Sequence, residues 1–321
     1  MDKIHSCCLD FLREQNLIAQ IEVAQEKQST VLNLSCFIME TVPNSVFELT
    51  ELKKLYLDVN KLYVLPDHVA KLKNLEVLTV DHNNLSGLPS NLYQIKNLIH
   101  LNLSHNPLRK LPEEVSKLKC LESLWVNSTL LSELPPSLGH LERLVTLGAR
   151  WNSISNYPSE LCYFFKLRWL TLEGNNLKQL PSEFQNLVGL KHLNLSRNLF
   201  EEIPPSIVHI KELKFCYMHQ NCIICVSEII LQKLKHLKRL DLRGNPLSSK
   251  INRKTFTYVV LENGQNHNTQ MESSDSEDFE FSIASSDINN SSDSSLDEPD
   301  VELETTLAQL SRFAISASSP L

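Results

Sequence analysis

The sequence predicts an α/β solenoid, a horseshoe whose concave side is a parallel β-sheet, with a helical N-terminal cap and a disordered acidic C-terminal tail. Three observations support this prediction. A 23-residue template recurs from position 29 onward, leucines mark the same slots in each copy, and proline fills one slot in register. A fixed period of this length is the signature of a repeat array. The proline slot holds Pro43, Pro66, Pro89, Pro112, Pro135, Pro158, Pro181 and Pro204.

Each copy opens with L-x-x-L-x-L, in which buried and exposed positions alternate. Alternation with period 2 is typical of a half-buried strand, so successive copies should pair into a parallel sheet with leucines inward. Each fully buried Leu contributes roughly 1.5 to 3 kcal/mol, which favours stacking. Copies start at positions 29, 52, 75, 98, 121, 144, 167, 190 and 213, and a partial tenth copy begins at Leu237 after one inserted residue.

An asparagine follows the strand in most copies. Its amide both donates and accepts, so it can satisfy backbone groups that the turn removes from the sheet. Phe37 and Thr129 replace it in the first and fifth copies. We therefore expect an interrupted ladder there, with looser packing around Thr129. The slot is otherwise filled by Asn60, Asn83, Asn106, Asn152, Asn175, Asn198, Asn221 and Asn245.

On the outer side of each copy, Leu-Pro followed by an apolar residue and Leu predicts an extended bend that enters a short helical turn. Proline fixes φ at this point and has no N–H to leave unsatisfied. Strands inside and wider turns outside predict a curved array.

A solenoid has two open ends, each of which exposes core and a strand edge. Residues 1–28 are expected to form one or two amphipathic helices that cover the first repeat. Their apolar positions are Ile4, Cys8, Phe11, Leu12, Ile18 and Ile21. We assign residues 29–247 to nine repeats and a partial tenth, 248–264 to a C-terminal cap, and 265–321 to a disordered, acidic, Ser-rich tail.

The Leu-Pro template, the lead-in LIAQIEVAQEKQSTVLNLS and the ending LDLRGNPL resemble the intracellular 23-residue leucine-rich repeat family related to the Ras-Raf pathway scaffold. The resemblance covers about residues 16–247 and implies a leucine-rich-repeat horseshoe. It also implies a noncatalytic binding scaffold that acts on small GTPases, kinases or phosphatases. The resemblance specifies the fold but not the partner.

The template leaves four positions free on each concave strand: the second residue after the opening Leu, the one inside L-x-L, and the two just after it. All three tryptophans of the chain fall there, in three consecutive copies. Aromatic residues with Arg are typical of buried interface anchors. The alternative is that adjacent aromatics simply pack on one another. We predict a protein-binding site formed by Trp125, Arg150, Trp151, Trp169, Glu173, His192, Arg197, Phe215, Tyr217 and His219.

Histidines on the same face leave pH sensing or a metal site open as alternatives. Ligands of one ion must converge within a few ångströms, yet these residues are mostly on different copies, so we expect no metal. Cys222 and Cys225 have the spacing of a zinc-ligand pair, with His219 nearby. No second pair follows, which favours structural packing. The histidines are His82, His100, His105, His192 and His219.

The chain has seven Gly, and none forms a phosphate-binding loop; H-E-x-x-H and G-x-S-x-G elements are also missing. We therefore predict neither an enzyme nor a bound cofactor. Up to residue 271 the chain carries 30 basic residues against 26 acids, an excess too small to favour nucleic acid as partner. A patch around Arg150, Arg197, Arg239 and Arg243 keeps that alternative open.

Charged residues interrupt the first fifteen positions, and no apolar run approaches the roughly 18 to 20 residues of a spanning helix. The sequence therefore predicts no membrane partner and a cytoplasmic location, with the nucleus as a second compartment. The eight cysteines are then expected to be reduced, and several, such as Cys216, fill core slots as small hydrophobes.

The predicted tail is strongly acidic. Twelve of the 38 acids lie between Glu272 and Glu304, with too little apolar content to fold alone. Ser274, Ser294 and Ser295 each have an acid three residues on, as in acidophilic-kinase sites, and a merely solvating tail is the alternative. We hypothesise that the tail competes with the partner for the basic part of the concave face.

Two functions follow from these patterns. The first is a noncatalytic interaction scaffold or adaptor that binds a protein partner on the concave face through Trp125, Trp151 and Trp169. The second is a regulatory or targeting subunit of a signalling enzyme in a phosphatase, kinase, small GTPase or ubiquitin ligase pathway.

Overall fold

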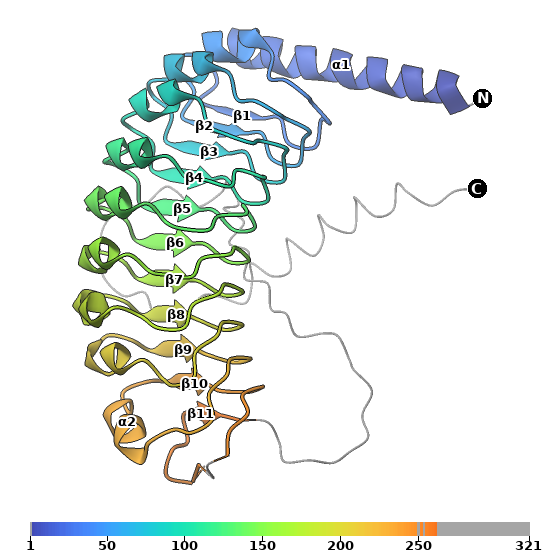
Figure 1. Cartoon of the computed structure of the whole chain (residues 1–321). Coiled ribbons are helices and arrows are strands. Elements are labelled where there is room, and N and C mark those ends of the chain that lie inside the picture. The colour runs from blue at the N-terminus through green and yellow to red at the C-terminus, as the bar shows by residue number, and fades with distance from the viewer. Residues whose placement is uncertain (1, 249–250, 253, 262–321) are drawn as a thin grey trace. The chain divides into compact units, whose positions relative to one another are not determined.

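A computed structural model describes residues 2–248, 251–252 and 254–261. Within them the chain forms one parallel sheet whose strands are neighbours in sequence order (Figure 1). The strands are β1 (Val31–Asn33), β2 (Lys54–Tyr56), β3 (Val77–Thr79), β4 (His100–Asn102), β5 (Ser123–Trp125), β6 (Thr146–Gly148), β7 (Trp169–Thr171), β8 (His192–Asn194), β9 (Phe215–Tyr217), β10 (Arg239–Asp241) and β11 (Val259–Val260).

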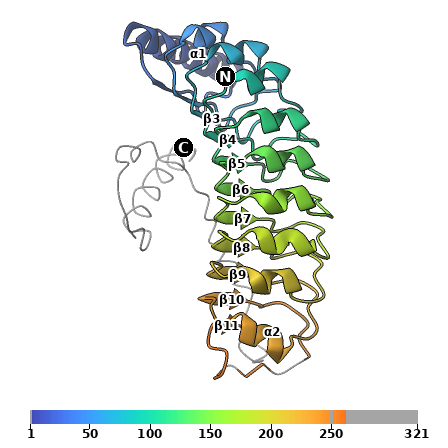
Figure 2. The ribbon, with the colours of Figure 1, turned by 90° about the vertical axis from the view of Figure 1, so that its left-hand side faces the viewer.

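Short helices lie on the side of the solenoid opposite the strands (Figure 2). The α-helices are α1 (Asp2–Glu26), before the sheet, and α2 (Glu228–Lys233), before β10. The 3-10 helices are η1 (Asn44–Glu48), η2 (Asp67–Lys71), η3 (Ser90–Gln94), η4 (Glu113–Lys117), η5 (Pro136–His140), η6 (Ser159–Tyr163), η7 (Ser182–Asn186) and η8 (Pro205–His209). Each 3-10 helix follows a template proline, for example Pro66 with φ −64° and ψ 148° before η2, which confirms the predicted bend and helical turn.

The register of the sheet follows the sequence period. Leu55 of β2 lies opposite Leu78 of β3, which lies opposite Leu101 of β4. Between β9 and β10 the offset grows by one, because Phe215 lies opposite Arg239. The inserted residue is therefore absorbed outside the strands, in the turn that carries α2. The predicted parallel sheet is confirmed.

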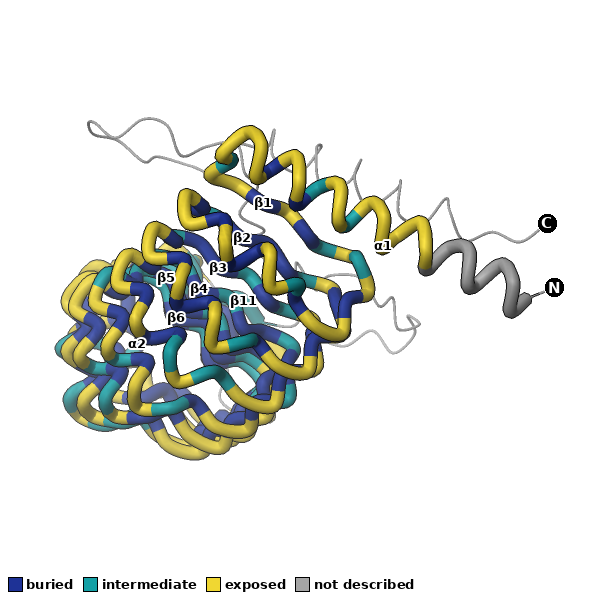
Figure 3. Tube along the Cα trace, turned by 90° about the horizontal axis from the view of Figure 1, so that it is seen from above, coloured by how far each residue is buried: buried dark blue, intermediate teal, exposed yellow. Residues whose placement is uncertain are grey.

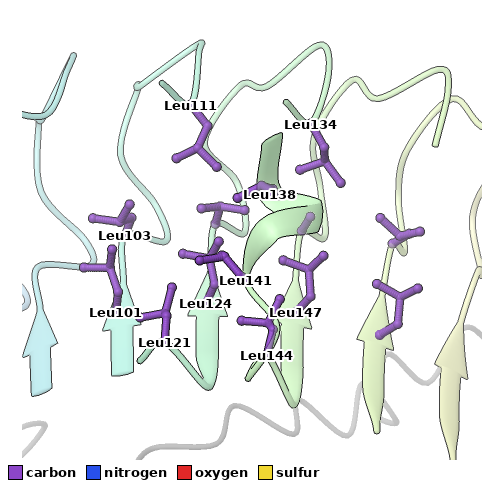
Figure 4. Packing of buried hydrophobic residues seen from close by; sticks show 14 of the residues in the cluster. Leu101, Leu103, Leu111, Leu121, Leu124, Leu134, Leu138, Leu141, Leu144 and Leu147 are labelled. Atoms are coloured by element: carbon purple, nitrogen blue, oxygen red, sulfur yellow. The ribbon is translucent and has the colours of Figure 1, made fainter. Parts of the chain in front are cut away.

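The core is a column of leucines stacked from one repeat to the next. Leu101, Leu124 and Leu147 point inward from β4, β5 and β6 and are fully buried (Figure 4). Buried residues recur at the same place in every turn of the chain (Figure 3). Because each such Leu contributes roughly 1.5 to 3 kcal/mol, a repeat is stabilised mainly by its neighbours.

The asparagine ladder connects consecutive turns through the side-chain amide. In the third repeat, the Asn83 Nδ2 donates to the carbonyl oxygens of Leu57 and Val80, at 3.0 and 2.9 Å. Its Oδ1 accepts from the N–H of Leu62 at 2.9 Å. One buried amide therefore satisfies backbone groups on two turns, as predicted.

Thr129 interrupts this ladder, but the predicted looser packing is wrong. Its side chain is fully buried, and its Oγ1 donates to the Val126 carbonyl at 2.7 Å. The Asn152 Oδ1 accepts from the N–H groups of Thr129 and Leu131, at 3.0 and 2.9 Å. The hydroxyl and the next asparagine thus replace the missing amide, so the core stays closed.

The N-terminal end is only partly covered by α1. Ile21 and Ala24 are buried against the first repeat, whereas Phe11 and Leu12 are 60% and 62% exposed. The expectation that Phe11 and Leu12 cover the first repeat is therefore wrong. A 25-residue helix is about 37 Å long and extends beyond the edge it covers (Figure 3). The side chains of Ile4 and Cys8 lie outside the described residues.

At the C-terminal end, β11 pairs with β10, and Phe256 and Val259 are buried. The Tyr258 hydroxyl donates to the Leu231 carbonyl and so joins this segment to α2. The acidic tail assigned to 265–321, with Ser274, Ser294 and Ser295, lies outside the described residues. In the part of the chain that the structure describes, no helix combines the length and apolar character needed to cross a membrane.

Candidate protein-binding face

Counting the opening Leu of each repeat as position 1, positions 4 and 6 point into the core, so positions 3, 5, 7 and 8 form four rows on the concave face. All ten residues predicted for the binding site lie in these rows. Trp169, His192 and Phe215 are in row 3, Trp125 and Tyr217 in row 5, Arg150, Glu173 and His219 in row 7, and Trp151 and Arg197 in row 8.

Two of the tryptophans rest on glycines of the following repeat. A Cβ placed on Gly148 would lie 2.1 Å from Cε3 of Trp125, in the same row. A Cβ on Gly174 would lie 2.5 Å from Cε3 of Trp151. Only glycine leaves room for these indoles, so each tryptophan is held against the sheet by the residue after it in its own row.

Trp151 is also covered on one side by a charged group. The guanidinium carbon of Arg197 lies 5.1 Å from the centroid of the Trp151 ring, which is a cation–π contact. The Arg197 Nε is 3.6 Å from a carboxylate oxygen of Glu173. Despite both contacts, Trp151 keeps 46% of its surface exposed. The indole is therefore oriented but still available.

Row 3 carries a stack of three rings from β7, β8 and β9. The Trp169 and His192 rings lie 3.5 Å apart and nearly parallel, and His192 and Phe215 lie 4.7 Å apart at 14°. Burial, with Lys191 and Lys214 nearby, lowers the pKa of His192 to about 4. The imidazole is therefore neutral at pH 7. Trp169, at the end of the stack, is 43% exposed.

The alternative raised from the sequence, that adjacent aromatics pack on one another along the sheet, is observed in row 3. It does not bury the tryptophans, so it orders the surface without removing it from solvent. A large side chain that is already ordered loses little conformational entropy when a partner covers it.

Arginines dominate the charge of this half of the face. Arg239 and Arg243 share the Asp241 carboxylate, at 3.3 and 2.8 Å. Burial alone would raise the pKa of Asp241, but hydrogen bonds from Arg243 outweigh it and lower the pKa. The Arg150 Nε is buried without a hydrogen-bond partner. In repeats 5 to 10, rows 3, 5, 7 and 8 carry four arginines and two acids, Glu173 and Asp241, so their net charge is +2.

The histidines pair with neighbours rather than with one another around a common centre. His82 stacks on His105 at 4.0 Å and contacts the Asp81 carboxylate at 2.9 Å, and the His219 Nδ1 lies 2.7 Å from the Ser196 Oγ. Burial lowers the pKa of His219. Among the described residues, no group of three or more His, Cys, Asp or Glu side chains could hold a metal ion.

The interpretation of Cys222 and Cys225 as packed structural residues is wrong, because both are exposed. They lie in the turn after β9, where Ile223 between them takes the buried slot. Cys162 and Cys216, by contrast, are buried, and burial is the main reason that the pKa of each thiol rises to about 12.

Gly148 and Gly174 were not predicted as part of the site. They lie exactly one repeat after Trp125 and Trp151, at positions 5 and 8, so a comparison along each row could have found them. Reasoning within single repeats missed them, because the indoles lean along the array and not across it.

Comparisons with known proteins agree with this architecture. A leucine-rich repeat model matches residues 50–108, and a leucine-rich repeat region model matches residues 152–255. The molecule is a leucine-rich-repeat solenoid, a fold that generally mediates protein–protein interaction and is typically non-enzymatic. No curated protein matches the chain.

Several solved structures share the fold. An internalin from Listeria monocytogenes aligns with a TM-score of 0.62 at 18% identity, over 74% of this chain and 67% of its own. A TDR receptor aligns at 0.61 and 29% identity, over 69% of this chain and 40% of its own. The plant peptide hormone receptor RGFR1, in complex with RGF2, aligns at 0.59 and 28% identity, over 70% and 38%. The chain thus spans about two fifths of either receptor chain.

Proposed function

We propose that this protein is a noncatalytic interaction scaffold or adaptor that binds a protein partner on the concave face of repeats 5 to 10. The observation that carries the proposal is the state of the tryptophans: Trp151 and Trp169 are ordered by their neighbours yet nearly half exposed. Such aromatic residues beside arginines are typical of interface hot spots.

The resemblance to Ras-Raf pathway scaffolds and a cytoplasmic location belong to this proposal. The plant receptor named above was solved with RGF2 bound, which supports a protein-binding use of the fold but identifies no partner here.

A pull-down from cell lysate tests the proposal. The wild-type chain is compared with a variant that carries Trp125→Ala, Trp151→Ala and Trp169→Ala, and captured proteins are quantified by mass spectrometry. We expect one set of partners to be lost from the variant. The matched control carries Tyr63→Ala, Val64→Ala and Ile229→Ala, three exposed apolar side chains outside the concave rows, and should retain that set. Retention of every partner by the tryptophan variant would contradict the proposal.

A second candidate is a regulatory or targeting subunit of a signalling enzyme. It is favoured by α1, whose Phe11 and Leu12 extend beyond the repeats and are exposed. In that case a catalytic subunit should be recovered with the tryptophan variant and lost after Phe11→Ser and Leu12→Ser. The scaffold proposal predicts that these two changes leave the partner set unaltered.

A further inference from the structure

One flank of the solenoid, where each turn approaches its strand, departs from the template at two adjacent repeats. Position 22 is exposed in each repeat from the second to the eighth and carries Lys or Glu in most of them. In repeats 6 and 7 it carries Phe165 and Val188, which are 65% and 56% exposed. The charged occupants are Lys73, Lys96, Lys119, Glu142 and Lys211.

Two of the lysines at this position contact the backbone of the next repeat. The Lys96 Nζ lies 3.4 Å from the Lys117 carbonyl, and the Lys119 Nζ donates to the His140 carbonyl at 3.1 Å. Each of these two lysines therefore contacts the carbonyl of position 20 in the next repeat, which is the last residue of the 3-10 helix of that repeat. Phe165 and Val188 cannot donate such a bond. Exposed apolar groups replace a stabilising contact there, so the solenoid itself does not explain them.

Phe165 and Val188 occupy the same position of adjacent repeats, where the two backbones lie close together. A Cβ on Gly189, the residue after Val188, would lie 3.1 Å from the Phe165 carbonyl oxygen. Tyr163, two residues before Phe165, is 50% exposed at a position where other repeats carry polar side chains. We call Tyr163, Phe165 and Val188 the flank patch. Exposed apolar side chains that gather on adjacent repeats are a stronger sign of an interaction site than scattered single residues are.

The surroundings of the flank patch are basic. We count the charges at positions 22 and 23 of each repeat and at position 2 of the repeat that follows it. For repeats 6 to 8, these positions carry five basic residues and one acid, a net charge of +4. The same positions of repeats 1 to 4 carry four lysines and three acids, a net charge of +1. The basic residues are Lys166, Arg168, Lys191, Lys211 and Lys214, and the acid is Glu212. Like charge disfavours contact between the flank patches of two copies of this chain.

We infer that the flank patch is a second protein-docking surface, distinct from the concave face, and that it binds an acidic segment of a partner that carries apolar side chains. Charge complementarity selects the acidic character, and Phe165 with Val188 provides the apolar anchor. The Arg168 guanidinium donates to the Gly189 carbonyl at 2.6 Å, which orders this charge on the backbone next to Val188.

The test uses a fluorescein-labelled 12-residue peptide of alternating Leu and Glu, followed by fluorescence anisotropy with the full chain. Phe165→Thr with Val188→Thr installs the exposed residue that repeat 1 carries at this position, Thr50, and leaves the charge of the patch unchanged. The fold should be kept, and thermal unfolding checks this. Loss of two apolar anchors should weaken binding by about tenfold or more. Tyr63→Thr, at an exposed aromatic elsewhere, should have no effect.

A peptide of alternating Leu and Lys should bind at least tenfold more weakly than the acidic one if charge contributes as inferred. Equal binding of the acidic peptide to wild type and the threonine variant, or no binding to wild type, would overturn the inference. Two other results, each combined with failure of the peptide to bind, would also overturn it. One is sedimentation of the chain with phosphatidylserine vesicles that depends on Phe165 and Val188, and the other is dimerisation, measured by light scattering, that depends on the same two residues. The tryptophan triple variant should retain the peptide, so the two proposals fail separately.

Discussion

The concave faces of repeats 1 to 4 and of repeats 5 to 10 share one backbone but differ in how their side chains are used. In the first region, the Asp58 Oδ1 accepts from Ser35 and Thr79, and Asp81 accepts from Asn102 and contacts His82. Carboxylates there are satisfied by neighbours on the same face. In the second region, the exposed side chains include the indoles of Trp151 and Trp169 and the guanidinium of Arg197.

Polar atoms without partners do not separate the two regions. The Tyr56 hydroxyl and the His100 Nδ1 lack hydrogen bonds in the first, as do the Arg150 Nε and the Thr171 Oγ1 in the second. The exposed, pre-ordered tryptophans separate them. Val31 and Val59 in the first region are also exposed, at 42% and 48%, so the second region differs by exposed aromatic surface beside arginines and not by exposed apolar surface in general.

The largest expected effect on stability tests whether the asparagine ladder supports the two regions equally. Asn83→Ala in the first and Asn198→Ala in the second each remove an amide that bonds four backbone groups. Leaving those groups unsatisfied should lower the free energy of unfolding by about 2 to 3 kcal/mol in both cases. Urea denaturation measures this. A loss confined to one variant would show that the regions differ in construction and not only in surface.

A smaller effect on stability is expected in the second region, at the glycine against which Trp125 packs. Gly148→Ala places a methyl group against Trp125, and relief of this clash should cost about 1 to 2 kcal/mol of stability and move the indole. Tryptophan fluorescence and urea denaturation report the two consequences. Gly87→Ala, in the first region, meets no atom within 4 Å and serves as the control. Unchanged tryptophan fluorescence in the Gly148→Ala variant would mean that Gly148 does not position the Trp125 indole.

The smallest effect concerns pH. The pKa of His192 is lowered to about 4 in the folded chain, so the unfolded chain binds more protons between pH 4 and 6.5. Stability should therefore be complete above pH 6.5 and fall as pH drops toward 4. After allowance for solvent screening, the loss is about 1 kcal/mol or less. His192→Phe keeps a stacked ring and should flatten this part of the stability profile. An equally steep profile in the variant would assign the pH dependence to other groups.

The period and its slots predicted the fold, because Leu, Asn and Pro have fixed tasks in every turn. They also predicted which side chains face the concave side, since position alone decides this. Three features escaped because they depend on packing between elements. Thr129 can replace an amide with a hydroxyl, the length of α1 carries Phe11 away from the core, and the turn after β9 turns Cys222 outward.

The central claim is that the second region, and not the first, holds the partner. It is tested most directly by placing a photo-crosslinking phenylalanine analogue at Val59 in one variant and at Gln220 in another. Both residues lie in row 8, are exposed and have similar φ, 53° in each case. The account predicts crosslinking of partner protein in cells at Gln220 and none at Val59. Crosslinking at Val59 that equals or exceeds that at Gln220 would contradict it.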